Sequence, residues 1–62
     1  MDGINAMPTY LTTRDVARRL HVRKATVERW CRSGDLAAAF VGRQYLIDPA
    51  DLARFVRERR GR

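Results

Sequence analysis

The shortness of the chain constrains its fold more strongly than any other feature of the sequence. With 62 residues, the chain is close to the lower limit at which one apolar core holds a fold without disulfides or a metal ion. It contains one cysteine and one histidine, so it can form no internal disulfide and cannot supply the four ligands of a structural zinc site. We therefore expect a single small domain with no metal and no cofactor.

The charge balance favours a polyanionic partner. The chain carries 13 Lys and Arg residues against 7 Asp and Glu residues, for a net charge of +6, a bias typical of domains that bind nucleic acid, anionic membranes or acidic proteins. Because 45% of the residues are hydrophobic, the chain can fold, unlike a basic disordered tail. So small a core leaves little room for a substrate pocket, and we expect neither an enzyme nor a small-molecule substrate. No apolar run approaches the ~20 residues of a membrane span.

Two short helical patterns flank a tight turn in the first half of the chain. Thr12 and Asp15 have the spacing of a capping box, and the apolar residues that follow predict a first helix over residues 13–20. A second helical pattern covers residues 24–33 and ends at Gly34. The two helices are separated by a turn of only a few residues.

The second half of the chain predicts a hairpin and a last helix. Two short runs, residues 37–41 and 45–47, surround an expected three-residue loop, residues 42–44. Asp48 then has the position of a helix cap, and Pro49 that of the first helical residue. The apolar face of this helix is expected to consist of Leu52, Phe55 and Val56.

These elements make up one domain with short ends. Residues 1–9 mix Gly, Asn and Pro without periodicity and are expected to form a disordered leader. Residues 10–60 form the domain, which is mainly α with a small β-hairpin. After Val56 the chain is rich in arginine, and we expect a basic tail or a frayed end, of which residues 61–62 are the last part.

The outer face of the second helix is the strongest candidate for a DNA-reading surface. At 100° per residue, Ala25, Arg29 and Arg32 stack on one side of the helix. A helix fits the DNA major groove, where an arginine can donate two hydrogen bonds to guanine O6 and N7. The alternative is that both arginines are ordinary solvated charges. The opposite, core-facing side carries Val27, Trp30 and Cys31.

Basic residues near this helix are candidates for contacts with the DNA backbone. Arg23 and Lys24 stand at its start, and we expect them to contact phosphates, which position a protein on DNA without reading its sequence. Arg43 lies in the predicted hairpin loop, where Gly42 allows a tight turn. We expect Arg43 to enter the minor groove; the alternative is a solvated turn residue.

Four segments in this order resemble the excisionase and MerR-like winged helix-turn-helix domains of phages and bacteria. They are YLTTRDVARRLHV, ATVERWCRSGDL, VGRQYLI and DPADLARFV, and the resemblance covers residues 10–60. It implies a winged helix-turn-helix fold. It also implies that Arg43 contacts DNA from the wing and that the major groove is contacted by Ala25, Thr26, Arg29 and Arg32.

The turn departs from the pattern of these domains at two residues. His21 stands where they usually carry Gly at the helix end, so its backbone must adopt a less favourable conformation or the turn must differ. Arg23 stands where Ser or another small capping residue is common. This exchange weakens the helix start and adds a phosphate donor.

Phe40 and Leu46 depart from the pattern as well, because polar residues are more usual at these positions. A three-residue loop would pair Val41 with Tyr45 and put Phe40 opposite Leu46 on the outward face of the hairpin. We expect this exposed apolar pair to contact another protein, either a neighbouring copy on DNA or a recombinase. Ordinary exposed apolar side chains are the alternative.

The resemblance implies an excisionase, or recombination directionality factor. Such a protein binds repeated sites cooperatively, bends DNA and directs integrase-mediated prophage excision. Its partners would be double-stranded DNA, neighbouring copies of itself and a phage integrase, and it would be cytoplasmic and nucleoid-associated in a bacterial host, with no membrane partner.

Two other functions remain open. A small MerR-like transcription regulator would use the same DNA-facing residues, although full MerR regulators add a coiled coil and a sensor domain for which we expect no residues here. A protein-interaction module for an acidic partner would use the positive charge without touching DNA.

Overall fold

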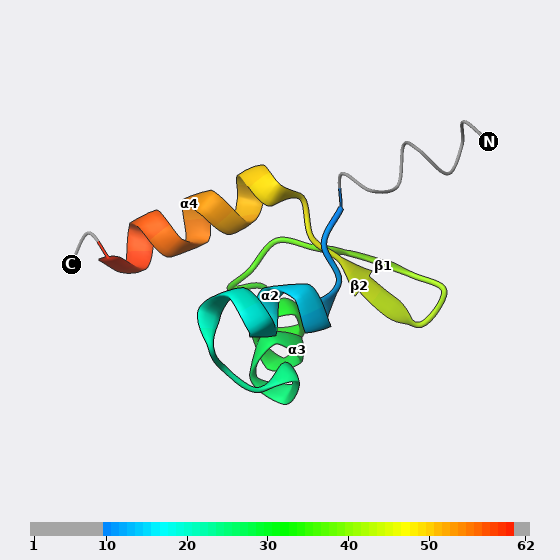
Figure 1. Ribbon diagram of the computed structural model, residues 1–62. Coiled ribbons are helices and arrows are strands. Elements are labelled where there is room, and N and C mark those ends of the chain that lie inside the picture. The colour runs from blue at the N-terminus through cyan, green and yellow to red at the C-terminus, as the bar shows by residue number, and fades with distance from the viewer. Residues whose placement is uncertain (1–9, 61–62) are drawn as a thin grey trace.

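The computed structural model describes residues 10–60 of the chain (Figure 1). In this range, three helices and a two-stranded antiparallel hairpin form a small winged helix-turn-helix, which confirms the predicted fold class. The predicted leader, residues 1–9, and tail end, residues 61–62, lie outside the described residues. The elements are α2 (Thr13–Leu20), α3 (Lys24–Ser33), β1 (Ala39–Val41), β2 (Gln44–Leu46) and α4 (Pro49–Arg60).

The first helix, α2, begins at the predicted capping box. The Thr12 backbone N–H donates to Asp15 Oδ2 at 3.0 Å, and the Asp15 N–H donates to Thr12 Oγ1 at 3.2 Å. These bonds satisfy donors that would lack partners in the first turn of a helix. Val16 and Ala17 on the inner face are buried. Both the bounds and the cap of the first predicted helix are therefore confirmed.

The turn between α2 and α3 is closed by a left-handed residue. His21 adopts φ 58° and ψ 44°, a conformation that Gly usually supplies at a helix end, so the less favourable backbone expected there is confirmed. The Val22 N–H donates to the Ala17 carbonyl oxygen at 3.0 Å, and Val22 packs against the core. Arg23, the N-cap residue of α3, makes no side-chain cap hydrogen bond.

The hairpin turns over two residues, so the predicted three-residue loop is wrong. Gly42 and Arg43 form the turn with φ 55° and φ 73°. Positive φ at both central residues is typical of a type I′ turn, whose twist matches that of the paired strands. The paired residues are Ala39 with Leu46, Phe40 with Tyr45, and Val41 with Gln44.

This register separates Phe40 from Leu46, and the predicted outward pair is also wrong. A shift of one residue in pairing moves a side chain to the other face of a hairpin. Phe40 therefore shares a face with Tyr45, and their ring centroids lie 4.9 Å apart. Leu46 lies on the opposite face with Ala39.

The last helix, α4, begins as predicted but extends further. The Ala50 N–H donates to Asp48 Oδ1 at 2.8 Å, and Pro49 is the first helical residue. The helix continues to Arg60, so residues 57–60 are helical rather than a basic tail or a frayed end. The predicted apolar face is confirmed, with Leu52 and Phe55 buried and Val56 packed against the core.

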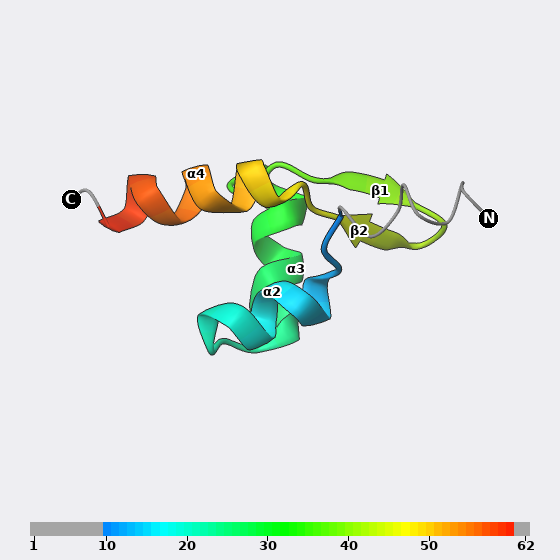
Figure 2. The ribbon, with the colours of Figure 1, turned by 45° about the horizontal axis from the view of Figure 1, so that its top comes forward.

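A single core joins these elements. Leu11 and Ile47 exchange two backbone hydrogen bonds of 2.8 Å, which tie the chain before α2 to the end of the hairpin. Figure 2 shows α4 and the hairpin extending in opposite directions from one end of α3. Within residues 10–60, no helix is long and apolar enough to cross a membrane. The buried apolar residues are Leu11, Val16, Ala17, Val27, Leu36, Ile47, Leu52 and Phe55.

Candidate nucleic-acid interface

The outer face of α3 carries the predicted reading residues in one row. Ala25, Arg29 and Arg32 are all exposed, and their spacing of four and three residues stacks them on one side of the helix. Thr26, at the edge of this row, is half-buried. No described acidic side chain forms a salt bridge with Arg29 or Arg32. The row therefore presents two arginines whose donors are available to a ligand.

The inner face of α3 belongs to the core, as predicted. Val27 is fully buried, and Trp30 and Cys31 pack against the core cluster. Burial raises the pKa of the Cys31 thiol, and the nearby Glu28 carboxylate raises it further. The thiol is thus protonated at neutral pH, which disfavours a role as a nucleophile.

An arginine of α4, Arg59, lies over the ring of Trp30. The Trp30 and Phe55 ring centroids lie 4.9 Å apart, and the Arg59 guanidinium lies 5.2 Å from the Trp30 centroid and 4.5 Å from that of Phe55. These distances are within the range of cation–π attraction. This contact fastens α4 to the core side of α3. The sequence showed Arg59 only as one of several arginines near the C-terminus.

Arg23 and Lys24, the predicted phosphate contacts, are both exposed at the start of α3. Lys24 Nζ lies 3.8 Å from Glu28 Oε2, one helical turn along. An exposed pair of this kind contributes little to stability, so a phosphate can displace Glu28 from Lys24 at small cost.

The wing and the starts of α2 and α3 line one hollow. A hollow of ≈ 430 Å³ lies between the starts of α2 and α3 and the hairpin. Arg43 and Lys24 line it from the hairpin and from α3, and Arg14 lines it from α2. The sequence shows Arg14 only as one of several basic residues on or near the first helix that could contact phosphates, and the tertiary arrangement brings it to the same hollow as Lys24 and Arg43. The remaining lining residues are Thr12, Thr13, Glu28, Gln44 and Tyr45.

The two predicted protein contacts have different surroundings. Phe40 is 64% exposed and packs against Tyr45 with the two rings tilted by 56°. Leu46 is half-buried and lines a shallow depression that also contains Tyr10 and Asp51. The structure does not bring them together into one patch, since they lie on opposite faces of the hairpin.

Comparison with known proteins identifies the family. A family model described as a helix-turn-helix domain matches residues 10–60, which is the whole range that the structure describes. No curated protein and no solved structure matches the chain.

Proposed function

Because this chain belongs to the helix-turn-helix domain family, we propose that it is a sequence-specific DNA-binding protein that acts as an excisionase. One observation carries the DNA-binding part of this proposal: the exposed row of Ala25, Arg29 and Arg32 on α3 lies beside the basic hollow that contains Lys24 and Arg43. Helix-turn-helix domains place such a helix in the major groove.

In this proposal α3 reads base edges. The helix has 10 residues, and an α-helix with its side chains is about 10–12 Å in diameter, which fits a major groove ~12 Å wide. Arg29 and Arg32 would donate to guanine acceptors, while Ala25 and Thr26 at the start of the helix allow close approach to the bases. The N-terminal part of a recognition helix is the part that contacts base edges in this class of domain.

Basic residues around α3 would hold the DNA backbone. Arg23 and Lys24 would bind phosphates on one side of the groove, and Arg43 would reach the minor groove from the wing. Two supports for the role of Arg43 are its exposure and its position across the hollow from Lys24.

The excisionase function concerns how several copies act together. A single short recognition helix reads few base pairs, so useful affinity requires several copies on adjacent sites. We propose that the chain binds repeated sites cooperatively, bends the DNA and so directs a phage integrase toward excision. The support is the resemblance of residues 10–60 to excisionase-like domains together with the family match.

Selection of binding sites from a random duplex library tests the DNA-binding proposal. We expect a short motif that contains guanine. Arg29→Ala should weaken binding to that motif by ~1 to 3 kcal/mol and relax the base preference, because a bidentate contact to one base is lost. Fluorescence anisotropy with selected and random duplexes measures both effects.

Arg54→Ala is the matched control, because Arg54 is an exposed arginine on α4 that lines neither the row on α3 nor the hollow. It should leave the base preference unchanged. Equal losses on selected and random DNA for Arg29→Ala would refute the reading role. Failure to bind any duplex at low salt would favour a protein-interaction module.

DNA bending separates an excisionase from a simple regulator. We expect fragments that carry the selected repeats at different positions to migrate differently in gels when the chain is bound. Uniform migration, with independent binding to each repeat, would favour a small transcription regulator instead.

A further inference from the structure

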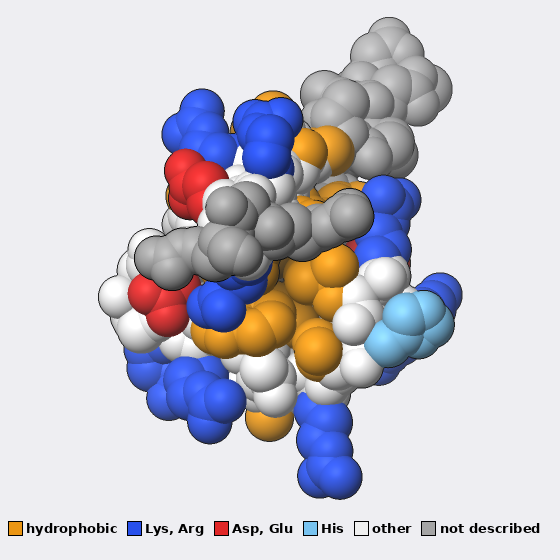
Figure 3. All heavy atoms as spheres, turned by 90° about the vertical axis from the view of Figure 1, so that its left-hand side faces the viewer, with side chains coloured by type: hydrophobic (Ala, Val, Ile, Leu, Met, Phe, Trp, Pro, Cys, Tyr) orange, Lys and Arg blue, Asp and Glu red, His pale blue; other side chains and the backbone are white. Residues whose placement is uncertain are grey.

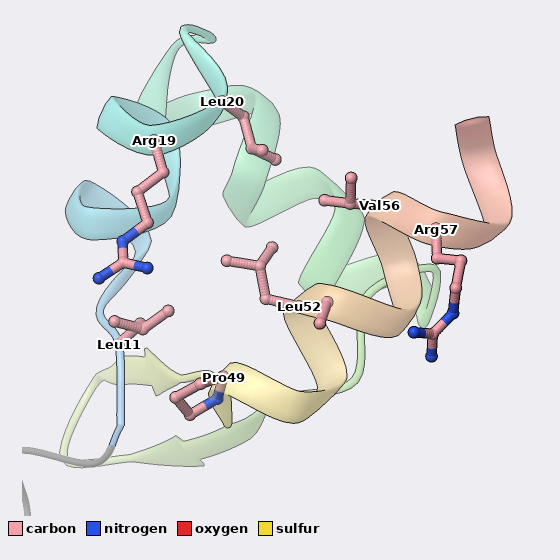
Figure 4. A pocket seen from close by; sticks show the side chains of 8 residues that line it. Leu11, Arg19, Leu20, Pro49, Leu52, Val56 and Arg57 are labelled. Carbon is pink, nitrogen blue, oxygen red and sulfur yellow. The ribbon is translucent and has the colours of Figure 1, made fainter.

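An apolar groove lies between α2 and α4, and none of the residues proposed to bind DNA lines it. It has a volume of ≈ 730 Å³, within the range of about 300–1,000 Å³ that ligand-binding clefts occupy. Figure 4 shows Arg19 and Arg57 on opposite sides of an apolar interior. The interior is formed by Leu11, Leu20, Pro49, Leu52, Ala53 and Val56.

The surroundings of the groove are positively charged. In the face shown in Figure 3, hydrophobic side chains gather near the centre, and most of the charged side chains around them are Lys and Arg, with acidic side chains at the left edge. The two charged residues that line the groove are both arginines. An apolar interior between two arginines matches a ligand that is apolar on one side and acidic at its edges.

DNA and a second copy of the chain fit this description poorly. Phosphates gain nothing from an apolar interior, which cannot replace their hydration. The exposed large apolar residues of the hairpin are Phe40 and Val41, but residues 39–46 contain Arg43 and no acidic residue. A hairpin from a second copy would therefore bring positive charge toward Arg19 and Arg57.

We propose that this groove binds an acidic amphipathic helix of a partner protein. Such a helix would place apolar side chains at helical spacing against Leu20, Leu52 and Val56, and its flanking carboxylates would pair with Arg19 and Arg57. Recognition of an amphipathic helix by an apolar groove is a recurring mode of peptide binding. The groove would tether the partner while α3 and the wing remain free for DNA.

A designed peptide pair tests this proposal with the full chain. The probe is a helical peptide of about four turns with leucines at positions i, i+3, i+4 and i+7 and glutamates beside them; the second peptide has lysines in place of the glutamates. We expect the glutamate peptide to shift the backbone amide NMR signals of Leu20, Leu52 and Val56, with and without bound DNA. The lysine peptide should leave these signals in place.

Charge reversal on α4 provides a matched pair of variants. Arg57→Glu should weaken binding of the glutamate peptide about tenfold, because an attraction becomes a repulsion. Arg54→Glu changes the net charge equally on an exposed position of the same helix outside the groove, and should change the affinity less than twofold. Both variants should bind duplex DNA to the same extent, so failure of this proposal is distinguishable from failure of the DNA-binding proposal.

Four outcomes would overturn the proposal. They are no binding of the glutamate peptide, equal binding of both peptides, equal losses in the two variants, and NMR shifts confined to the hairpin. Sedimentation of the chain without peptide provides a further test, because a dimer that Arg57→Glu strengthens would identify a second copy as the occupant.

Discussion

Within residues 10–60, two residues other than glycine have a left-handed backbone. His21 has φ 58° and Arg43 has φ 73°, a conformation that costs a residue with a Cβ atom roughly 1–2 kcal/mol. At His21 the strain ends α2. At Arg43 it lies at the tip of the wing, where Gly or Asn would be the residue of lowest cost. Strain at an exposed charged residue is consistent with a role for the side chain in binding.

Replacing Arg43 by glycine should therefore separate stability from binding. Arg43→Gly should raise the free energy of unfolding by about 0.5–1 kcal/mol, since glycine adopts positive φ without a steric penalty. It should also weaken DNA binding, because the proposed minor-groove contact is lost. Thermal unfolding and fluorescence anisotropy measure the two effects.

His21→Gly is the control for this experiment. It relieves the same kind of strain at the end of α2 and should raise stability similarly, with little effect on DNA affinity. If Arg43→Gly bound DNA as well as the unchanged chain, the proposed role of the wing would have to be abandoned.

The capping box makes stability depend on pH. The hydrogen bond from the Thr12 backbone N–H, followed by the contact with the Thr12 side chain, holds the pKa of Asp15 below its usual range, and Arg18 and Arg19 lower it further. A pKa that is lower in the folded state than in the unfolded chain stabilises the fold above the unfolded value, about 3.9. This contribution is lost as the pH falls through the folded pKa.

Asp15→Asn should accordingly lower stability at pH 7 and have a smaller effect at strongly acid pH. Urea unfolding of the unchanged chain and of Asp15→Asn, at pH 7 and near pH 2, measures the difference in their free energies of unfolding. The same stability difference at both values would mean that the charge of Asp15 contributes nothing to the cap.

At the scale of elements, α3 has one face that is proposed to read DNA and one face that belongs to the core. Its outer face carries the row of Ala25, Arg29 and Arg32, while Trp30 on the other side packs against Phe55 of α4. Arg59 covers both rings. The position of α4 therefore depends on an aromatic contact with the helix that is proposed to read DNA.

Loss of the Arg59 contact should loosen α4. Arg59→Ala should lower the free energy of unfolding by about 0.5–1 kcal/mol, the range for an exposed cation–π contact. It should also change the fluorescence of Trp30, which is the one tryptophan in the chain. Arg54→Ala should change stability by less than about 0.5 kcal/mol, and equal effects of the two variants would contradict a specific role for Arg59.

At the scale of the whole molecule, the proposed DNA surface and the apolar groove use different residues. The starts of α2 and α3 and the hairpin form the first, and α2 and α4 form the second. The net charge of +6 supports association with a polyanion over the whole surface. If both proposals hold, one copy has separate surfaces for DNA and for a protein partner.

Salt and site number should reveal how copies assemble on DNA. The logarithm of the binding constant should fall linearly with the logarithm of salt concentration, and Lys24→Ala should reduce the slope by about 1, because one phosphate contact releases one counterion. On a fragment with two repeats, binding should be cooperative. Titrations between low and physiological salt on fragments with one and two repeats measure the salt dependence and the cooperativity. Identical slopes for the unchanged chain and Lys24→Ala would mean that Lys24 does not contact a phosphate.

Local signals in the sequence determined the helices. Three signals act within about four residues along the chain: the capping box of Thr12 and Asp15, the helix end at Gly34 and the helix start at Pro49. Their effects can therefore be predicted without the rest of the fold. The same holds for the two faces of α3, because helical periodicity alone separates Val27 from the exposed row.

Only the tertiary structure decided the register of the hairpin, the length of α4 and the grouping of the surfaces. Two-residue and three-residue loops are both compatible with the sequence around Gly42, and the choice changes which side chains share a face. Arg59 contacts Trp30, and Arg14 lines the same hollow as Arg43, although each pair is separated by more than 20 residues in the chain. Contacts between distant residues depend on how the elements pack, and local sequence patterns carry no information about that packing.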